Sequence, residues 1–399
     1  DSRLVVLNAR DAEARGARIL TRTKVTGARR ENGLWRVTLQ DRDSILDVRK
    51  TTRGDTLQRR RGRRSPVRGL LSGKTYRSKN RKIRLEHEGL LDFSQLGFNT
   101  VDGWHYGQQL RLHYKINKTK TLRSHLAAGY AFNRKAPMFT WNSNLLYAPK
   151  RRGKISLNMD YTSFDFNRET GIPPLTNSVY SLFLRENYSK RYENLNATLE
   201  NRLDLANGLV LYTRAEGAVR SPLQNHSDFS FFFRDSKDYT TNEPADASLL
   251  ARSNLLAARA SLEYTPAYRY RMVSGRKHMV SSPWPTFSLS YRQAIPLEQS
   301  GWAEYSHISA GIRQELEAGL LSTLSYRVKA GYFPSAAAMH YSDLEHFKAS
   351  PLLVDMNGFN DAFMFLDFYE ASSQEWYTTL DAELRSSYLL LKLLPWVSE

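Results

Sequence analysis

Four side chains of the types that bind divalent metals lie close together near the end of the chain. They are His340, Asp343, Glu345 and His346. Imidazole and carboxylate groups at this spacing could bind a divalent cation. Loops rich in aspartate and histidine are also common without a bound metal, so we predict no metal site and treat the cluster as a candidate to be tested.

Other catalytic chemistry has no sequence signature in this chain. There is no H-E-x-x-H, no G-x-S-x-G, no G-x-G-x-x-G and no phosphate-binding loop. The chain has no cysteine, which excludes thiol nucleophiles, disulfides and thiolate metal sites. We therefore predict a protein that is not an enzyme, with no catalytic residue, no cofactor-binding residue and no cofactor.

Two further polar patterns have a simple structural interpretation and a sharper functional one. His105 and His113 lie eight residues apart in one segment, with Arg111 between them. They could form a proton-linked gate, or simply line a hydrated interior. Arg214 beside Glu216 and Arg313 beside Glu315 could act as acid and base pairs, but salt bridges in a narrow lumen explain them more simply.

The element that carries the histidine pair is an almost perfectly alternating segment from Trp104 to Ile116. Apolar and aromatic residues occupy the even positions, polar and basic residues the odd ones, and only Gln108 breaks the pattern. Successive side chains of a strand point to opposite faces, so this segment forms a ribbon with one apolar and one polar face. A strand of about 12 residues with this pattern is what an outer-membrane barrel requires.

Similar segments recur along most of the chain. The predicted strands are Trp104 to Ile116, Leu122 to Phe132, Trp141 to Tyr147, Ile155 to Tyr161, Leu195 to Leu205, Leu209 to Val219, Leu256 to Tyr264, Phe287 to Tyr291, Ile308 to Leu316, Leu324 to Tyr332 and Trp376 to Leu384. Their polar faces are rich in arginine, lysine and acidic residues, which suits a lumen better than a protein core. A large soluble β-sandwich or solenoid also alternates and remains the alternative, although its buried face should favour Val and Ile over Tyr, Trp and Leu.

The connections between these segments differ in length. Asn117 to Thr121 and Ala206 to Gly208 are short, whereas other connections are long and polar: Asn167 to Asn194, Arg220 to Asn254, Pro266 to Pro285 and Phe333 to Glu375. Bacterial barrels have short turns at one end and long loops at the other. We expect the same asymmetry here, with aromatic residues near the strand ends at the two water boundaries.

The net charge of +18 is concentrated in one segment. Between Arg49 and Arg84 there are 15 basic residues and one acid, Asp55, whereas the rest of the chain is nearly balanced. The Arg59 to Arg64 core could bind phosphates of nucleic acid or of lipid headgroups. We interpret the segment as a basic connector lying against an anionic membrane surface, and we expect no nucleic-acid partner.

Residues 1–44 form a piece of different character. A helix capped by Ser2 and ending at Gly16 is predicted, followed by strands at Arg18 to Thr23 and Leu34 to Leu39, with an Asn32-Gly33 turn between them. From Leu4 to Asp41 the sequence resembles an internal stretch of the FAD-dependent glycerol-3-phosphate dehydrogenases. That family's dinucleotide fingerprint and catalytic half are not matched, so the resemblance implies no FAD site here.

From about Asp47 onward the chain resembles an outer-membrane β-barrel family of unassigned function. The matching stretches are Gly69 to Trp104, Asn177 to Glu193, Asn207 to Asn225, Pro285 to Pro296 and Leu344 to Pro351. The most specific element is Gly97 to Gly103, which leads into the first long strand. In full-length members the barrel follows a carboxypeptidase-regulatory-like domain, and the resemblance implies further closing strands beyond Leu393 to Val397. We interpret the reading frame as a chimera or a fragment.

Together these observations predict an all-β fold, an antiparallel transmembrane β-barrel of about 12 visible strands, truncated at its C-terminus, with a small α/β N-terminal piece. The predicted domains are residues 1–44, the basic connector 45–90 and the barrel 91–399. We expect a non-enzymatic protein of the bacterial outer membrane, a pore, transport or envelope assembly protein, whose partners are the lipid bilayer and, at the connector, anionic lipid headgroups. The alternative is a remnant of an FAD-dependent glycerol-3-phosphate dehydrogenase.

Overall fold

The computed structural model describes residues 23–31, 34–41, 71–167, 172–245, 247–298, 300–317, 322–349, 363 and 366–386. The chain divides into two compact units, Asp1–Pro66 and Val67–Glu399. In the first unit, β1 (Thr23–Glu31) pairs with β2 (Leu34–Asp41) as an antiparallel hairpin. β2 confirms the strand predicted from Leu34, whereas the predicted helix, the Asn32-Gly33 turn and nearly all of the strand predicted at Arg18 to Thr23 lie outside the described residues.

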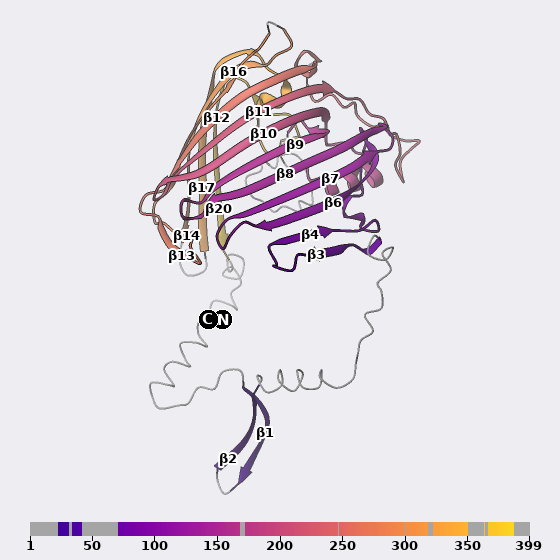
Figure 1. The fold of residues 1–399 in the computed structure, drawn as a ribbon. Coiled ribbons are helices and arrows are strands. Elements are labelled where there is room, and N and C mark those ends of the chain that lie inside the picture. Colours follow the sequence, from indigo (N-terminus) through magenta and orange to yellow (C-terminus); the bar gives the residue numbers. More distant parts are fainter. Residues whose placement is uncertain are drawn as a thin grey trace, which may run out of the picture. The chain divides into compact units, whose positions relative to one another are not determined.

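The second unit is built on one 14-stranded sheet, shown in Figure 1. Its strands are β3 (Lys74–Arg77), β4 (Ile83–His87), β5 (Gly97–Asn99), β6 (Gly103–Lys115), β7 (Thr121–Ala131), β8 (Ala136–Ala148), β9 (Gly153–Asp165), β10 (Arg191–Ala206), β11 (Leu209–Pro222), β12 (Ser253–Tyr264), β15 (Thr286–Ala294), β16 (Glu304–Glu317), β17 (Ser322–Ala338) and β20 (Trp376–Ser386). Every strand predicted by alternation is present, so the all-β prediction is confirmed. A sandwich would need two packed sheets, and the large sheet is a single one.

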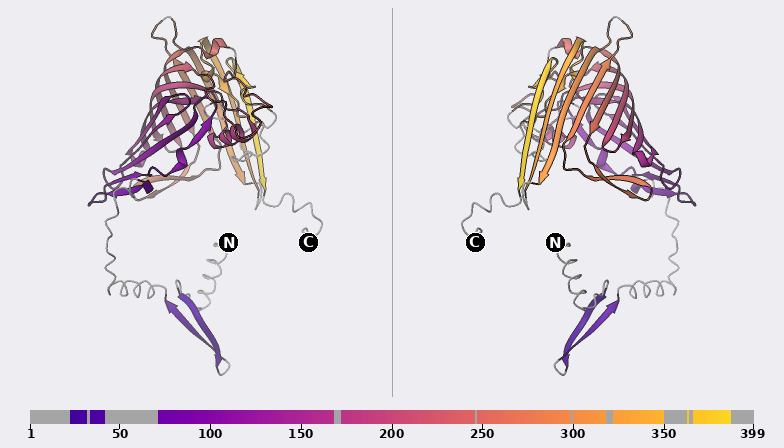
Figure 2. Two further views of the ribbon diagram at one scale, coloured as in Figure 1. Left: turned by 90° about the vertical axis from the view of Figure 1, so that its right-hand side faces the viewer. Right: turned by 90° about the vertical axis from the view of Figure 1, so that its left-hand side faces the viewer.

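The sheet order is β20-β17-β16-β15-β12-β11-β10-β9-β8-β7-β6-β4-β3, with β5 on the side of β6. Sequence neighbours pair antiparallel, and the sheet curves into a barrel, as the two side views in Figure 2 show. Within the described residues, β3 and β20 are the two edges and do not pair with each other.

The N-terminal side of the sheet differs from the prediction. β4 pairs with β6 from His87↔Leu110 to Ile83↔Tyr114, and β3 pairs with β4. The segment from Trp104 is therefore the first long strand, as the resemblance implied, but it is not the first strand of the sheet. Short strands from the predicted basic connector precede it, because Ile83 and Leu85 alternate with charged residues over only a few positions, too few to stand out in a basic segment.

Connections alternate between the two ends of the barrel because neighbouring strands are antiparallel. The turn end has the connections after β6, β8 and β10, and the loop end has those after β9, β11 and β17. The connection between β12 and β15 is long but lies at the turn end, contrary to the predicted asymmetry. Most of it is a hairpin of β13 (Arg269–Val273) and β14 (Arg276–Ser281), whose Ser274-Gly275 turn has the two positive φ angles of a tight hairpin.

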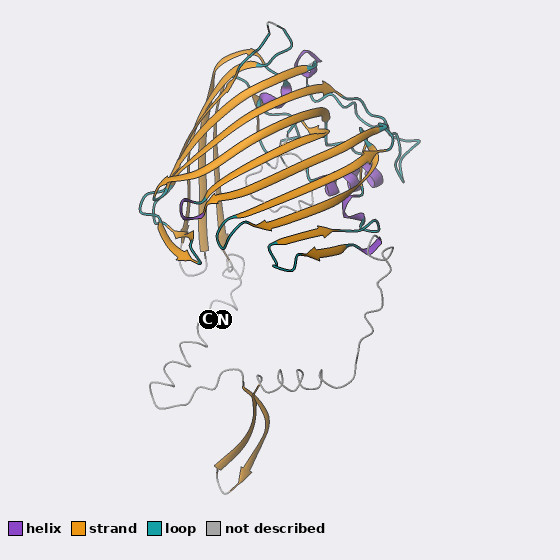
Figure 3. Ribbon diagram, in the orientation of Figure 1, coloured by secondary structure: helices purple, strands orange, loops and turns teal. Residues whose placement is uncertain are grey.

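Among the described residues, helices are confined to the connections (Figure 3). They are η1 (Phe93–Gln95), η2 (Pro149–Arg151), α4 (Pro174–Val179), the π-helical turn η3 (Tyr180–Leu184), η4 (Ala247–Leu250) and η5 (Tyr341–Asp343). The short bridge β18 (Glu345–His346) pairs with β19 (Ser372–Ser373) in the connection between β17 and β20. Among the described residues, no helix has the length and apolar composition of a membrane span.

Candidate functional site

The outer face of the barrel wall is apolar and exposed. Pairing places Leu262 opposite Leu289 and Phe287 opposite Ile312. A longer row crosses four strands, with each residue opposite the next: Tyr291, Ile308, Tyr332 and Trp376. All eight of these side chains are exposed. A soluble protein would bury apolar rows of this extent rather than expose them.

The inner face is polar. Asn194, Asn196 and Thr198 of β10, and Glu216 and Arg220 of β11, are buried on the face opposite the apolar rows. Two cavities of about 800 Å³ and 710 Å³ lie inside the wall, the first toward the loop end and the second toward the turn end. The barrel is therefore polar inside and apolar outside, as we predicted from the alternation.

A segment of the connection after β17 folds into the loop end of the lumen and lines the larger cavity. Asp343 of η5 accepts hydrogen bonds from Arg220 (2.7 Å) and from the hydroxyl of Tyr305 (2.9 Å). The side chains of Asp343 and Arg220 are each only 2% exposed. On either side of η5, Met339 and Phe347 pack against the apolar cluster around Tyr305 and Phe333. We call residues 339–348 the lumen segment.

The candidate metal ligands all lie in or next to η5, but they do not converge. Asp343 pairs with Arg220 and Glu345 with Lys329. His346 contacts the hydroxyl of Ser372 (2.7 Å) and the carbonyl of Tyr341 (2.9 Å), and Nδ1 of His340 contacts the hydroxyl of Ser342 (2.8 Å). Within the described residues, no group of three potential ligands is close enough to hold a metal ion. Asp343, Glu345 and His346 thus tie the lumen segment to residues outside it, and the ring of His340 does so by stacking on Phe166.

Both histidines are held neutral. Burial and the neighbouring Arg220 lower the pKa of His340 to about 3, and burial lowers the pKa of His346 to about 4. The pKa of Asp343 is also lowered, because the guanidinium groups of Arg220 and Arg292 outweigh the effect of burial, which acts to raise it. At neutral pH the lumen segment thus holds two uncharged imidazoles and two carboxylates, Asp343 paired with Arg220 and Glu345 paired with Lys329.

We expect acidification to loosen the lumen segment as His340 and His346 take up protons. The unfolded histidines bind protons near pH 6.5, the folded ones only near 3 and 4, so their contribution to stability is complete above pH 6.5 and declines as the pH falls. Between about pH 7.5 and about pH 5 the unfolding free energy should fall by up to about 2 kcal/mol for each histidine. Urea unfolding at the two pH values measures this change. A His340→Asn, His346→Gln double variant with an equally steep pH dependence would contradict the assignment.

The cavity toward the turn end is strongly basic. Lys154, Arg202, Arg214, Arg259, Arg313, Arg327 and Lys329 line it together with only two acids, Glu200 and Glu263. Serines 156, 261, 288, 290 and 309 supply much of the remaining lining. Residues from β9 and from β17 face this cavity, so it spans the lumen.

The remaining predicted pairs have mixed outcomes. His105 and His113 do not form a pair, because eight residues of strand separate them by about 26 Å. His113 lies opposite Arg84 and Arg123, and His105 opposite Ala131. Arg214 does pair with Glu216 (3.1 Å), as predicted, whereas Arg313 pairs with Glu263 on β12 rather than with Glu315.

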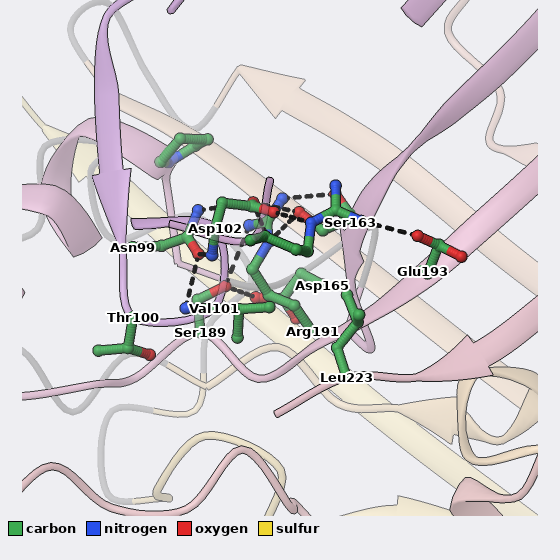
Figure 4. Close-up of polar contacts among 12 residues, drawn as sticks. Asn99, Thr100, Val101, Asp102, Ser163, Asp165, Ser189, Arg191, Glu193 and Leu223 are labelled. Carbon is green, nitrogen blue, oxygen red and sulfur yellow. Dashed lines mark hydrogen bonds and ion pairs between the residues drawn. The ribbon is translucent and has the colours of Figure 1, made fainter. Parts of the chain in front are cut away.

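The Gly97 to Gly103 signature forms a buried turn at the loop end (Figure 4). The side-chain oxygen of Asn99 accepts hydrogen bonds from the backbone N–H groups of Val101 (3.0 Å) and Asp102 (2.7 Å), and its amide donates to Asp102 (3.0 Å). Gly103 has a positive φ of 68°, and a Cβ there would collide with Asn133. The signature thus specifies a tight turn that only glycine can complete.

Asp102 is the centre of this turn. It is fully buried, accepts a hydrogen bond from Nε of Arg134 (2.8 Å) and one from the hydroxyl of Ser163, and lies 3.8 Å from Nε of Arg191. Burial alone would raise its pKa, but Arg191, Ser163 and Arg134 together hold the pKa below its ordinary value. Arg134 also donates to Glu193 (2.7 Å).

The turn ties distant segments to the ends of β9 and β10. The carbonyl of Thr100 accepts hydrogen bonds from the backbone of His226 and Ser227, and the hydroxyl of Ser178 bonds to the backbone of Phe98. From the sequence we recognised this segment as a signature but assigned it no role. Its Asn-x-x-Asp-Gly spacing, with a side-chain acceptor before two backbone donors, was the signal of a structured turn.

Comparisons with known proteins give one family match over most of the chain and two short matches to curated enzymes. Residues 68–399 match the model of a family described as "Family of unknown function (DUF5686) C-terminal domain". Two curated enzymes match over short stretches: the aerobic glycerol-3-phosphate dehydrogenase of Escherichia coli, 52% identical over 44 residues, and the D-erythritol 1-phosphate dehydrogenase of Brucella abortus, 57% identical over 56 residues. These stretches are 11% and 14% of this chain, and 9% of the length of either enzyme.

Among solved structures, the chain is similar to the crystal structure of BamA from Haemophilus ducreyi lacking POTRA domains 1–3. The identity is 12% and the TM-score 0.39, and the likeness covers 89% of this chain and 63% of that one.

Proposed function

Because the chain belongs to the DUF5686 C-terminal domain family, whose function is unknown, its role must be inferred from its own residues, and we propose that it is a non-enzymatic β-barrel of the bacterial outer membrane. The observation that carries this proposal is the distribution of residues on the barrel wall, with exposed apolar rows outside and buried charged groups inside. The long strands, of 9 to 17 residues, are long enough to cross a bilayer, which takes about 9–11 residues per tilted strand. From β3 to β20 the described strands satisfy one another's backbone hydrogen bonds, as a lipid environment demands, and the outer edges of β3 and β20 are unpaired within the described residues.

An aromatic patch at the loop end supports the same placement. Phe231, Phe232 and Phe233 are exposed, and Phe183 of η3 lies 5.3 Å from Phe231, ring centre to ring centre. Phe229 connects this patch to Trp104 at the start of β6. Aromatic residues in this position, continuous with the apolar wall, are typical of the boundary between hydrocarbon and water.

The lumen suggests what the barrel does. The lumen segment occupies its loop end, held by ionic and apolar contacts, while the turn end contains the basic cavity. We propose a barrel whose loop end is closed by its own chain, so that passage of a solute requires the lumen segment to move. The alternative is a role in envelope assembly, in which no solute crosses the lumen. Planar-bilayer conductance separates the two.

Substitution on the outer face tests the membrane placement. Leu199, near the middle of β10, points outward and is 51% exposed. A Leu199→Lys variant should lose about 2–4 kcal/mol of stability in a bilayer, because lysine at the midplane of the lipid face must be desolvated. In a soluble protein the same exposed substitution should change stability by less than about 0.5 kcal/mol. Urea unfolding from lipid vesicles measures the difference.

The neighbouring residue provides a matched control. Thr198 points into the lumen, opposite Glu216 and Asn158. Thr198→Lys places the same charge one residue away, beside an acid and a water-accessible cavity, so its cost should be much smaller. Equal tolerance of both lysines in vesicles would refute a lipid-facing outer wall.

The dehydrogenase alternative applies only to the N-terminal unit. The chain spans 9% of the length of the curated dehydrogenases that it matches, and its sequence has no dinucleotide fingerprint. We therefore propose no oxidoreductase activity for this chain. Flavin bound to the purified protein would favour the dehydrogenase alternative instead.

A further inference from the structure

We propose that the basic cavity at the turn end of the lumen binds a small soluble anion that carries several phosphate or carboxylate groups. This proposal rests on the barrel described above and names the ligand class of its lumen. It depends on the register of the inner face rather than on where the barrel resides.

The main observation is a row of like charges across the wall. Register places Arg214 of β11 directly opposite Arg259 of β12, and Arg259 directly opposite Arg292 of β15. Side chains directly opposite on one face of a sheet have Cβ atoms about 4.5–5.5 Å apart, and like charges at that distance destabilise the sheet. Nothing in barrel packing alone requires three arginines in line.

Acids within the lumen neutralise only the two ends of the row. Arg214 pairs with Glu200 (3.2 Å) and Glu216 (3.1 Å), and Arg292 lies 3.4 Å from Glu216. Arg259, in the centre, donates to the neutral hydroxyl of Ser290 (2.8 Å). Within the described part of the chain, Arg259 has no ion pair, so its charge faces the cavity without a carboxylate partner.

The cavity around Arg259 adds to this excess. Its seven basic lining residues include Arg214 and Arg259 of the row, and of the seven Arg214, Arg313 and Lys329 pair with acids; two acids and several serines complete the polar lining. Arginine presents a planar fork that matches phosphate and carboxylate in a bidentate geometry. A volume of about 710 Å³ is within the range of small-molecule sites. The lining therefore suits a compact polyanion better than a neutral sugar or an apolar ligand.

Stabilisation by added anions tests the proposal. A ligand that binds only the folded state raises the unfolding free energy by RT ln(1 + L/Kd), where L is the free ligand concentration. We expect pyrophosphate, or the tricarboxylate citrate, at about 1 mM to raise the urea midpoint of the refolded full chain. Potassium chloride at equal ionic strength should not do so. A response to pyrophosphate only, or to citrate only, identifies which anionic group the site prefers.

Variants locate the site. Arg259→Gln should weaken anion binding by at least about tenfold, because a charge-assisted pair is lost. In the absence of ligand the same variant should be no less stable than the wild type, since it relieves the repulsion in the row. Arg385→Gln, on an exposed arginine that pairs with Glu383 outside the cavity, is the matched control and should bind anions normally.

Each result decides the proposal. Absence of stabilisation by both anions overturns it, as does equal stabilisation by chloride. Equal binding by Arg259→Gln and the wild type, or equal loss in Arg385→Gln, would place the anion elsewhere. If Arg259→Gln does not fold, Arg259→Lys keeps the charge but loses the fork, and it must then bind more weakly than the wild type. Failure of these tests leaves the lysine test of the lipid-facing wall unaffected.

Discussion

Replacing Asp343 by alanine is expected to lower the free energy of unfolding by about 3–5 kcal/mol and to open the loop end of the lumen. The substitution leaves the guanidinium of Arg220 buried without its carboxylate, which is among the most costly single changes in a protein. It also removes the acceptor for the hydroxyl of Tyr305. Urea unfolding measures the first effect, and an increase in planar-bilayer conductance measures the second.

A paired replacement separates the ion pair from the packing. Changing Arg220 to Met and Asp343 to Leu together removes both charges and keeps comparable volume, so it should recover most of the lost stability. If the single variant is as stable as the wild type, Asp343 does not anchor the lumen segment. Unchanged conductance in a destabilised single variant would assign the segment a purely structural role and favour an assembly function for the barrel.

Replacing Asp102 by alanine is the second change with a large expected effect, again about 3–5 kcal/mol. Asp102 is the common partner of Arg134 and Ser163 and lies near Arg191, and all of these groups are partly or fully buried. Because the pKa of Asp102 is lowered in the folded state, its contribution is complete above its unfolded pKa of about 3.8 and is lost as the pH falls further. The expected loss is therefore seen at neutral pH and shrinks in strong acid.

Asp92 provides the control for this variant. Its carboxylate also accepts a backbone hydrogen bond at the start of a helical turn, from Ser94 (2.9 Å), but it contacts no buried arginine. Asp92→Ala should cost far less than Asp102→Ala, because it removes only a solvent-exposed N-cap hydrogen bond. Similar costs for the two alanine variants, measured by urea unfolding, would show that the buried charges around Asp102 contribute little.

The amino-acid sequence alone predicted the long strands and their two faces. Alternation has a period of two and is a local property, so Trp104 to Ile116 or Leu195 to Leu205 can be assigned without knowing any neighbouring strand. The same alternation predicted that Arg214, Glu216 and Arg313 point into the lumen. β3, β4 and the hairpin of β13 and β14 were missed because each is too short to establish a period.

Ionic partners could not be predicted in the same way. Arg313 pairs with Glu263, 50 residues away and two strands across, rather than with Glu315 on its own strand. Residues two apart on one strand share a face, but the curvature of the barrel and the register of β12, β15 and β16 decide which oppositely charged group lies nearest.

Sequence therefore determined which side chains face the lumen and which face outward, since a strand's alternation fixes this by itself. Only the tertiary structure decided that Asp343 pairs with Arg220, 123 residues away in the chain, and that the candidate metal ligands hold the lumen segment in place. It also decided that three arginines lie side by side in one row. Those contacts depend on strand register and on chain segments returning into the lumen. Both are set by the sum of many weak interactions along the whole sheet, which no single segment encodes.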